Sequence, residues 1–268
     1  MSGAAPRGAD AAPAAPDAPR PGGGWRIVEE RGAGTPAERV GADAALLEAV
    51  RRGDAPATAR VWDGARALVV ARADARLPRF ASACDALARE GWPVVVRESG
   101  GGAVPHGPGV VLLSLAFRPP EGAPFTLEDA YAALAAPLAR ALARLGVPCA
   151  LGHAPRSFCD GRFDLLAFGR KIAGTAQRWR ARPGSGTAAG AVLCHAALLV
   201  DLDLAEASAA VNRFYEAAGS PRRCDAAASI TLREALALAG ATGRDAGDLV
   251  GPARAALVEA LRAPRGSA

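Results

Sequence analysis

The sequence predicts an α+β fold in which a mixed, largely antiparallel β-sheet is flanked by helices. Two observations lead to this fold class. Short apolar runs typical of strands alternate with segments of helical periodicity along the whole chain. In the middle of the chain, short turns join the strands directly, which is the pattern of β-hairpins. A doubly wound parallel sheet is therefore not expected, and no internal repeat is present.

The first half of the chain contains the following predicted elements in order. Apolar spacing, valine-rich runs and the glycines at 64 and 91 set their limits. We expect a strand at 25–29, a helix at 42–52, a pair of strands at 59–63 and 67–72 that turns near Gly64, a helix at 78–90 that ends at Gly91, and strands at 93–98 and 109–117.

The second half begins with a long helix and continues with hairpins. Thr126 is suited to cap a helix that runs to about Leu145, with Asp129 three residues further on as in a capping box. We then expect a strand at 163–168, a tight turn at Gly169 and Arg170, a strand at 171–179, a loop at 183–186, a strand at 191–202, and helices at 204–217, 232–239 and 248–262.

Composition indicates one large globular domain at 25–264, because 50% of residues are hydrophobic and only 22% are charged. Residues 1–24 are rich in Ala, Pro and Gly and lack a periodic apolar face, so a disordered tail is expected there. The start of the chain has no secretory signal pattern, and no apolar run is long enough to span a membrane. We therefore expect a cytoplasmic protein, without membrane partners and as a monomer.

The net charge of +5 does not indicate a nucleic-acid partner, because the arginines are scattered and aromatic residues make up only 5% of the chain. A mildly basic surface suits an acidic protein partner equally well. Five cysteines without a C-x-x-C pair favour reduced thiols over disulfides or a zinc site, and Cys84, Cys149 and Cys194 are expected in the core. The sequence does not identify a metal site, and His153 is assigned a surface or structural position.

Lys171 is the only lysine among 32 Lys and Arg residues, and it lies between two glycines in the segment Gly169–Gln177. Lysine is a compact point charge whose three donors can converge on one group of oxygens, whereas arginine is a planar fork. A site that needs a point charge would therefore retain a lysine. On position alone, Lys171 could equally be a remnant in an arginine-rich composition.

A second candidate segment runs from Arg97 to Gly109 and contains three consecutive glycines, Gly100, Gly101 and Gly102. Bare glycine backbone allows close approach of a ligand, with N–H groups directed at an anion such as a phosphate or carboxylate. The alternative is a glycine-rich turn between two strands, since the segment lacks the Gly-Lys-Ser/Thr ending of a P-loop. His106, in the same segment, would by itself be a core or loop histidine.

Together these segments resemble the lipoate-protein ligase family and its relatives, the octanoyltransferases and biotin ligases. The resemblance spans residues 25–236 and includes Arg60-Val61-Trp62 and Ile230-Thr231-Leu232. The residues that carry it at the site are Arg97, Ser99, Gly100, Gly101, Gly102, Ala103, Val104, His106, Lys171, Gly174, Thr175, Ala176 and His195. The order of the two motifs is quite specific for the superfamily and less so for the reaction.

The resemblance implies a biotin/lipoate ligase type of catalytic domain, with lipoate or octanoate as substrate. Ser99 to Val104 would line the acyl and nucleotide pocket, with His195 as pocket support. Lys171 would hold the acyl carbonyl and the phosphate of an acyl-adenylate. ATP and Mg²⁺ would activate the acid, and the acceptor would be a lysine of a lipoyl domain, in a 2-oxoacid dehydrogenase complex or the glycine cleavage H protein.

Some features of the sequence depart from this pattern. Arg162-Phe163-Asp164-Leu165 stands where ligases show Arg-Asn-Asp-Leu, so one polar contact is missing. Cys159 lies close to the nucleophilic cysteine of one octanoyltransferase branch, and Cys224 precedes Ile230-Thr231 as in another branch. The chain also ends too soon for a full accessory domain, whose need the sequence leaves open.

The ATP-dependent ligase is therefore the main functional prediction, and two alternatives remain. The first is a transferase that works without ATP through a thioester at Cys159, or less plausibly Cys224, with Lys171 favouring the thiolate or acting as base. The second is a catalytically silent module that binds an acyl group or a small acid. Either cysteine could instead be a buried small hydrophobe.

Overall fold

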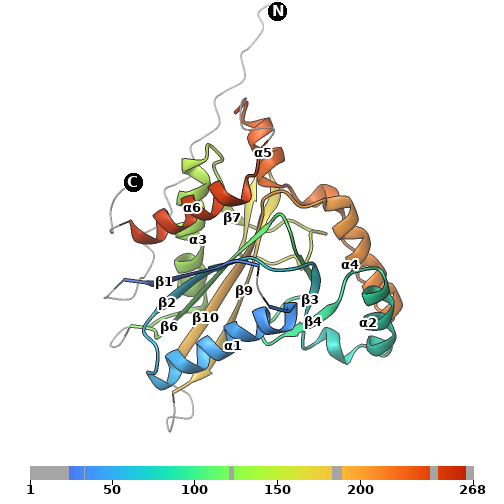
Figure 1. Cartoon of the computed structure of the whole chain (residues 1–268), viewed down its shortest axis with the longest axis horizontal. Coiled ribbons are helices and arrows are strands. Elements are labelled where there is room, and N and C mark those ends of the chain that lie inside the picture. The colour runs from blue at the N-terminus through green and yellow to red at the C-terminus, as the bar shows by residue number, and fades with distance from the viewer. Residues whose placement is uncertain (1–23, 33, 121–123, 183–188, 242–246, 264–268) are drawn as a thin grey trace, which may run out of the picture.

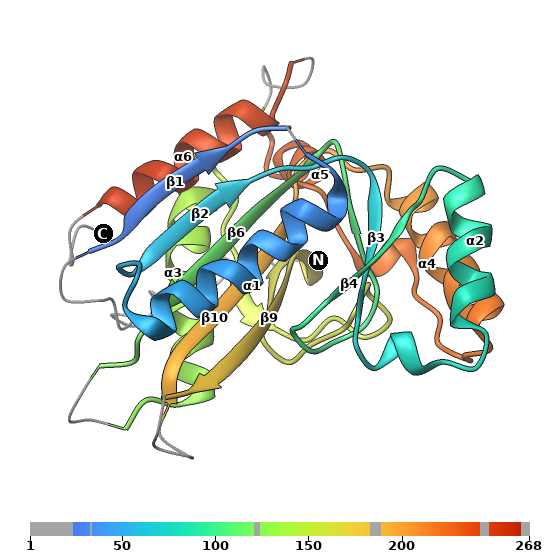
Figure 2. The same ribbon diagram turned by 60° about the horizontal axis from the view of Figure 1, so that its bottom comes forward.

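The computed structural model describes residues 24–32, 34–120, 124–182, 189–241 and 247–263. In these residues the strands form two sheets, drawn in Figures 1 and 2. The larger sheet has the order β1-β2-β6-β10-β9-β8-β7 and the smaller has the order β4-β3-β5. The strands are β1 (Arg26–Glu30), β2 (Thr58–Trp62), β3 (Ala67–Ala71), β4 (Val94–Arg97), β5 (Val104–His106), β6 (Val110–Phe117), β7 (Ala150–Gly152), β8 (Asp164–Ala167), β9 (Arg170–Ala181) and β10 (Ala189–Leu199).

Most neighbouring strands are antiparallel, and β1–β2 and β3–β4 are the parallel pairs. The predicted mixed, largely antiparallel class is confirmed. The expected tail at 1–24 lies almost entirely outside the described residues, as do the loop predicted at 183–186 and the last residue of the domain predicted at 25–264.

Helices cover both faces of the large sheet, and Figure 2 shows α1 lying across β6 and β10 with α3 and α6 on the opposite side. A helix pair, α2 and α4, packs beside the small sheet. The helices are α1 (Pro36–Arg52), α2 (Phe80–Arg89), α3 (Leu127–Arg144), α4 (Leu204–Ala218), α5 (Leu232–Leu238) and α6 (Val250–Arg262), with short 3₁₀ turns at Asp74–Arg76 and Ala226–Ala228.

Strand β6 shows why the large sheet is covered on both faces, since all eight of its residues are buried. Val111, Leu113 and Leu115 pack into the core beneath α3 and α6. The residues between them face the other way, where Leu112 packs near Trp62. This two-residue alternation of a fully buried strand leaves the α1 side of the sheet to carry the site.

Three of the predicted elements differ from the structure, and two short strands were not predicted. The strands near Gly64 do not pair, because β2 joins β1 and β6 while β3 joins the small sheet, so residues 63–66 carry the chain from one sheet to the other. Helix α1 begins six residues earlier than predicted, at Pro36, where Thr35 and Glu38 form a complete capping box. The short strands β5 and β7 are not signalled by the sequence pattern.

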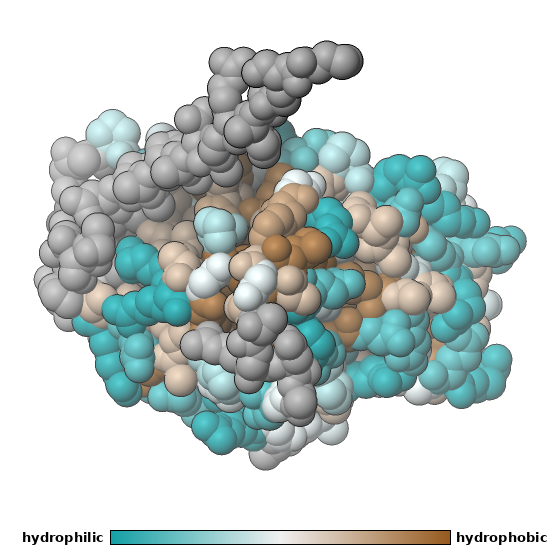
Figure 3. Space-filling model, turned by 90° about the horizontal axis from the view of Figure 1, so that it is seen from above, coloured by the Kyte–Doolittle hydropathy of each residue, from teal (hydrophilic) through white to brown (hydrophobic). Residues whose placement is uncertain are grey.

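The hairpin turn before Lys171 is shifted by one residue from its predicted place. Its central residues are Phe168 and Gly169, both with positive φ, and Arg170 already pairs with Ala167. The capping box of Thr126 and Asp129 on α3 is confirmed. Figure 3 shows apolar side chains gathered near the middle of one face with hydrophilic ones around them. None of the described helices is long and apolar enough to cross a membrane.

Candidate active site

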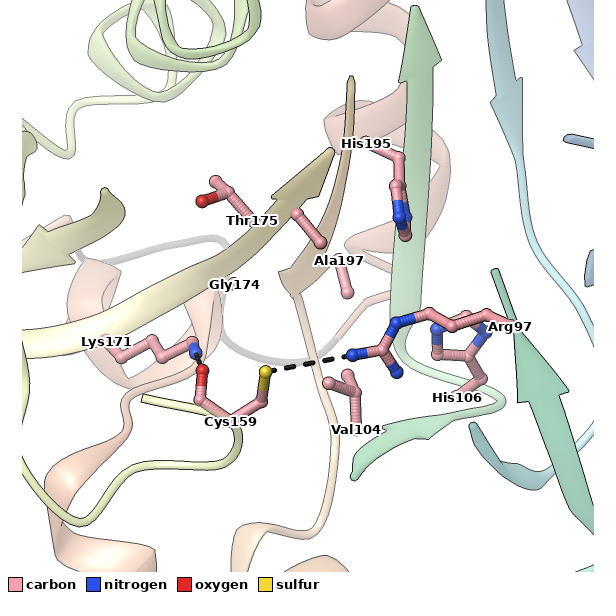
Figure 4. A pocket seen from close by; sticks show the side chains of 10 residues that line it. Arg97, Val104, His106, Cys159, Lys171, Gly174, Thr175, His195 and Ala197 are labelled. Carbon is pink, nitrogen blue, oxygen red and sulfur yellow. Dashed lines mark hydrogen bonds between the residues drawn. The ribbon is translucent and has the colours of Figure 1, made fainter. Parts of the chain in front are cut away.

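Residues from both sheets line one pocket, shown in Figure 4. It encloses about 320 Å³, counting the space at its mouth. Strands β9 and β10 supply one wall, β4 and β5 supply the opposite wall, and the segment between β7 and β8 supplies a cysteine. The lining residues are Arg97, Val104, His106, Cys159, Lys171, Gly174, Thr175, Ala176, His195 and Ala197. The pocket therefore unites the glycine segment with the lysine segment.

The ammonium group of Lys171 is buried, and all of its donors are engaged. Its Nζ lies 2.9 Å from Oδ2 of Asp164 and donates to the carbonyl oxygens of Phe158 at 2.6 Å and Cys159 at 3.1 Å. Burial raises the pKa of Asp164, and the ammonium offsets part of that effect, as do the backbone N–H groups of Gly161 and Thr175. Lys171 thus fixes the backbone around Cys159, and its charge has a buried counter-ion.

Gly174 is required by the path of the Lys171 side chain. A Cβ atom at position 174 would lie 2.8 Å from Cε and 3.0 Å from Nζ of that lysine. Contacts this short do not occur at ordinary Cβ atoms, and the ammonium is held by three oxygens and cannot move aside. In the motif Gly-Arg-Lys-Ile-Ala-Gly, the side chain of Lys171 therefore lies across the backbone of Gly174, which has no side chain to block it.

The thiol of Cys159 lies at the mouth of the glycine loop. Its Sγ accepts a hydrogen bond from the backbone N–H of Gly102 at 2.8 Å and lies 3.8 Å from Nη2 of Arg97. The residue itself has a φ of 47°, a left-handed conformation that costs a non-glycine residue about 1 kcal/mol or more. Both contacts are donors directed at the sulfur, and the strained backbone directs it into the pocket.

Arg97 organises the glycine loop from within. Its guanidinium donates to the carbonyl oxygens of Val69, Gly100 and Gly102 at 2.7–2.9 Å, and its Nε is buried without a hydrogen-bond partner. Among the described ion pairs, none involves this guanidinium. A buried cation with an unsatisfied donor beside a pocket is suited to an incoming oxygen atom.

Two N–H groups of the glycine loop, which the sequence suggested for an anion, have partners within the protein. The N–H of Gly102 donates to the sulfur of Cys159, and the N–H of Ala103 donates to the hydroxyl of Tyr215 at 2.8 Å. Lack of side chains is nonetheless essential there. A Cβ at Gly101, whose φ is 102°, would overlap the sulfur, and one at Gly102 would lie 2.7 Å from the Tyr215 oxygen.

Two histidines complete the pocket as neutral groups. Burial lowers the pKa of both His106 and His195 to about 3, and the positive charge of Arg97 adds to the effect. Nε2 of His195 lies 2.7 Å from Oγ of Ser99, which agrees with its predicted role in pocket support. The ring of His106 packs edge-on against Trp62, 5.8 Å between centroids.

The other cysteines lie away from this pocket. Burial raises the pKa of Cys224 to about 11, and its thiol points at the carbonyl oxygen of Ser208 on α4. Burial also raises the pKa of Cys149 to about 12 and strongly raises that of Cys194. Cys84 is only partly buried on α2. Cys159 is thus the cysteine that the fold places in the pocket.

The sequence did not single out four residues that support the site. Asp164 could have been found from the sequence, because it is the aspartate of the Arg-x-Asp-Leu segment. Phe163 occupies the place of the missing asparagine, and its ring stacks on that of Tyr131 with 4.5 Å between ring centroids. Tyr215, Arg222 and Asp74 carry no sequence signal, because α4 and two loops bring them together. Arg222 lies 2.9 Å from the buried carboxylate of Asp74 and packs over the Tyr215 ring.

No cluster of three or more His, Cys, Asp or Glu side chains suited to a metal ion occurs in the part of the chain that the structure describes. His153 is exposed, 3.7 Å from Asp160, in agreement with its predicted surface position.

Comparison with known proteins adds three findings. The family model of the lipoyl protein ligase A/B catalytic domain matches residues 35–237. An octanoyl-[GcvH]:protein N-octanoyltransferase of Kyrpidia tusciae is 38% identical over 211 residues, which cover 78% of this chain and 72% of the relative. An uncharacterized protein of Cupriavidus necator, H16_B0148, is 41% identical over 73% of this chain and 80% of its own.

Solved structures agree on the fold. A crystal structure of lipoate-protein ligase A bound with ATP aligns with a TM-score of 0.62 at 19% identity and covers 88% of this chain and 83% of that one. A putative lipoate protein ligase of Thermoplasma acidophilum with bound lipoic acid aligns with a TM-score of 0.60 at 20% identity, over 88% and 84% of the two chains.

Proposed function

The chain belongs to the lipoyl protein ligase A/B catalytic-domain family and is an enzyme that acts on lipoyl proteins, and from this premise we propose that it is an octanoyltransferase. It moves an octanoyl or lipoyl group from one carrier protein to another through a thioester at Cys159. The observation that carries the proposal is the sulfur of Cys159, held at the pocket mouth by Gly102 and Arg97. The names of the curated relatives support the same reaction.

A second cavity supports an acyl substrate. It lies beneath α1 and shares Arg97, His106 and His195 with the pocket of Cys159. Its apolar lining comes from α1 and the two sheets, namely Val40, Ala44, Leu47, Trp62, Val69 and Leu193. Asp43, Glu98, Ser99 and Arg178 supply the polar part of the lining. A medium-length acyl chain attached to Cys159 can extend past the neutral histidines into this space. Their lowered pKa fits the proposal, because an apolar chain does not then meet a charged imidazolium.

The chemistry needs no external energy source when donor and acceptor are both amides. The Cys159 sulfur bonds to the acyl carbon, the amide C–N bond of the donor lysine breaks, and the thiol proton ends on the departing amine. The acceptor lysine amine then bonds to the same carbon. Its proton returns to the sulfur as the thioester C–S bond breaks. One amide replaces another, so the overall exchange is close to thermoneutral.

Three groups have distinct roles in this scheme. The N–H of Gly102 and the free Nε of Arg97 are placed to stabilise negative charge on sulfur or on the acyl oxygen, where loss of one donor typically costs about 10²- to 10³-fold in rate. Lys171 is a positioning residue, because its contact with Cys159 is to the carbonyl oxygen and not to the sulfur. This differs from the base role considered from the sequence.

ATP-dependent activation, the main prediction from the sequence, fits these residues less well. A nucleotide phosphate would have to displace Sγ and the Tyr215 hydroxyl from the N–H groups of Gly102 and Ala103. It would also compete with Asp164 for Lys171. No step through ATP or Mg²⁺ is therefore derived. For the acyl donor we propose the glycine cleavage H protein, named in the curated relatives, and for the acceptor the lipoyl domain of a 2-oxoacid dehydrogenase complex.

The test is transfer from an octanoylated H protein to an apo lipoyl domain without ATP. We expect product on the acceptor and, with the acceptor left out, an octanoyl adduct on the Cys159 peptide by mass spectrometry. Cys159→Ala should lose both, and Cys224→Ala, the matched control, should keep both. Transfer by Cys159→Ala, or pyrophosphate exchange that depends on octanoate or lipoate and ATP, would instead support the ligase. Octanoate binding without either reaction would support the silent module.

A further inference from the structure

Three non-glycine residues have a positive φ in the part of the chain that the structure describes, and they are the proposed nucleophile and one residue in each of the two segments that carry Cys159 and Lys171. They are Arg156 at 65°, Cys159 at 47° and Phe168 at 49°. Each such conformation costs about 1–2 kcal/mol relative to an ordinary backbone. Backbone strain concentrates where a side chain is needed in a particular place. The position of Cys159 is explained by its sulfur contacts, whereas those of Arg156 and Phe168 are not.

Phe168 departs from the usual chemistry of its turn. It is the first of two residues that join β8 to β9, and both have positive φ, so the turn favours Asn, Asp or Gly at this place. Burial does not compensate for the strain, because 49% of the phenylalanine remains exposed. An aromatic residue here disfavours the turn and leaves apolar surface in water. Neither local structure nor the core accounts for it.

Arg156 shows the same combination in a different setting. Its backbone is fixed, because its N–H donates to Oδ2 of Asp160 and its carbonyl oxygen accepts from the N–H of Asp225 at 2.7 Å. Its side chain is 71% exposed and meets Asp225 only at 3.6 Å. Such an exposed pair contributes little to stability. The hydrogen bonds of this loop therefore fix a backbone from which the Arg156 guanidinium extends into solvent.

We infer that Arg156 and Phe168 are the anchors of a docking surface for the acyl-carrying protein domain, an inference that rests on the proposed function. Arg156 is three residues from Cys159 and Phe168 is three residues from Lys171, a distance of about 10 Å each along extended chain. A typical partner covers about 800 Å² on each side, which reaches both positions from the pocket mouth. Arginine and aromatic side chains are also the types enriched at interface hot spots.

Charge identifies the occupant as an acidic domain. Arg222 and Arg223 are exposed in the loop that Asp225 ties to Arg156, and Arg162 is exposed on the same segment as Cys159. Asp160, Asp225 and Glu216 are the exposed acidic side chains among them, and Arg222 also pairs with the buried carboxylate of Asp74. The four exposed arginines outnumber these three exposed carboxylates, and the whole chain has a net charge of +5. Long-range attraction of an acidic carrier would speed its encounter with the enzyme and weaken with added salt.

The experiment replaces each anchor by a residue that suits a left-handed backbone, in Phe168→Asn and Arg156→Asn. Thermal unfolding should show equal or higher stability, because strain is relieved. With an octanoylated glycine cleavage H protein as donor, each variant should raise KM about tenfold, the equivalent of roughly 1.4 kcal/mol, while kcat stays within twofold. Acylation of Cys159 by a small octanoyl thioester should change less than twofold.

A matched control lies at the far end of α1. Arg52, 54% exposed, ends this helix beside Arg118, which follows β6. Arg52→Asn should leave KM for the donor unchanged.

The docking inference is overturned if both anchor variants keep KM within twofold of the wild type, or if reaction with the small thioester falls as much as reaction with the carrier. It is also overturned if Phe168→Asn abolishes self-association of the enzyme in sedimentation and leaves carrier binding intact. Should the wild type transfer no octanoyl group, the proposed function fails. Titration of the H protein against wild type and variants then tests docking alone.

Discussion

Arg97 and Lys171 reach the loop of Cys159 from opposite walls of the pocket, and Figure 4 shows the contrast between them. Both side chains are buried, and both donate hydrogen bonds to backbone carbonyl oxygens. Lys171 also touches a carboxylate, Asp164, so its charge is balanced inside the protein. Arg97 lies next to the sulfur and keeps a free donor. The balanced cation holds the structure of the loop, and the other remains available for the reaction.

Lys171→Met should produce the largest loss of stability and would show whether Lys171 has a structural role in the pocket. Removing one partner of a buried ion pair leaves Asp164 charged and uncompensated, which typically costs about 3–5 kcal/mol. We expect that loss in urea unfolding, together with loss of transfer. The double variant Lys171→Met/Asp164→Leu should regain much of the stability but no activity. Near-normal transfer by Lys171→Arg would contradict the need for a compact ammonium above Gly174.

Arg97→Met should lower both reactivity and stability on the other wall, because three carbonyl oxygens also lose their donor. We expect alkylation of Cys159 by iodoacetamide, followed on its peptide, to slow, because the sulfur loses its nearest cation. Arg222, Lys171, His106, His195 and Tyr131 also surround this thiol and remain unchanged in the variant. If the alkylation rate is unchanged, Arg97 does not control the reactivity of the sulfur, and the proposed difference between Arg97 and Lys171 is wrong.

Two adjacent glycines give a matched pair for testing how closely the loop approaches the sulfur. Gly101→Ala places a Cβ against Sγ at a φ of 102°, so about a tenfold or larger loss of thioester formation is expected. Gly100→Ala meets nothing within 4 Å and has no such φ, so its rate should stay within twofold. Equal rates for the two variants would mean that the loop moves away from Cys159 during reaction.

The smallest expected effect comes from pH, through the histidines beside Arg97. Their folded pKa of about 3 lies below the usual 6.5, so the unfolded chain binds more protons between these values. Stability is therefore complete well above pH 6.5 and declines as pH falls toward 3, by about 1.4 kcal/mol per histidine at pH 5.5. His195→Asn should flatten this dependence in urea titrations. An unchanged slope would place the titration elsewhere.

The sequence alone led to the fold class, to most helices and strands, and to a pocket between Arg97 and His195. These features follow from local patterns and from motifs whose residues are close along the chain. It could not separate the two sheets, because β2 and β3 are both fully buried and have the same strand pattern. Nor could it reveal Tyr215 or Arg222, which reach the glycine loop only through the packing of α4 against the small sheet.

The assignment of chemistry to the motif also depended on contacts that only three dimensions supply. The sequence favoured Cys159 over Cys224 but left both open, and the structure places the first in the pocket and the second against the Ser208 carbonyl oxygen. The glycine loop suggested an anion site because free N–H groups are invisible in a sequence, and two of them prove to be engaged by a sulfur and a phenol.

The last helix of the chain secures the first strand. Arg254 of α6 bonds to the carbonyl oxygen of Glu30 and to Asp63, across as many as 224 residues of sequence. Synthesis on the ribosome runs at about 5–20 residues per second. The contacts of Arg254 with Glu30 and Asp63 therefore form many seconds after β1 and β2 have been made. During that interval β1 and β2 are exposed to other nascent chains. Expression of this protein should accordingly benefit from chaperones that shield these strands until α6 has been made.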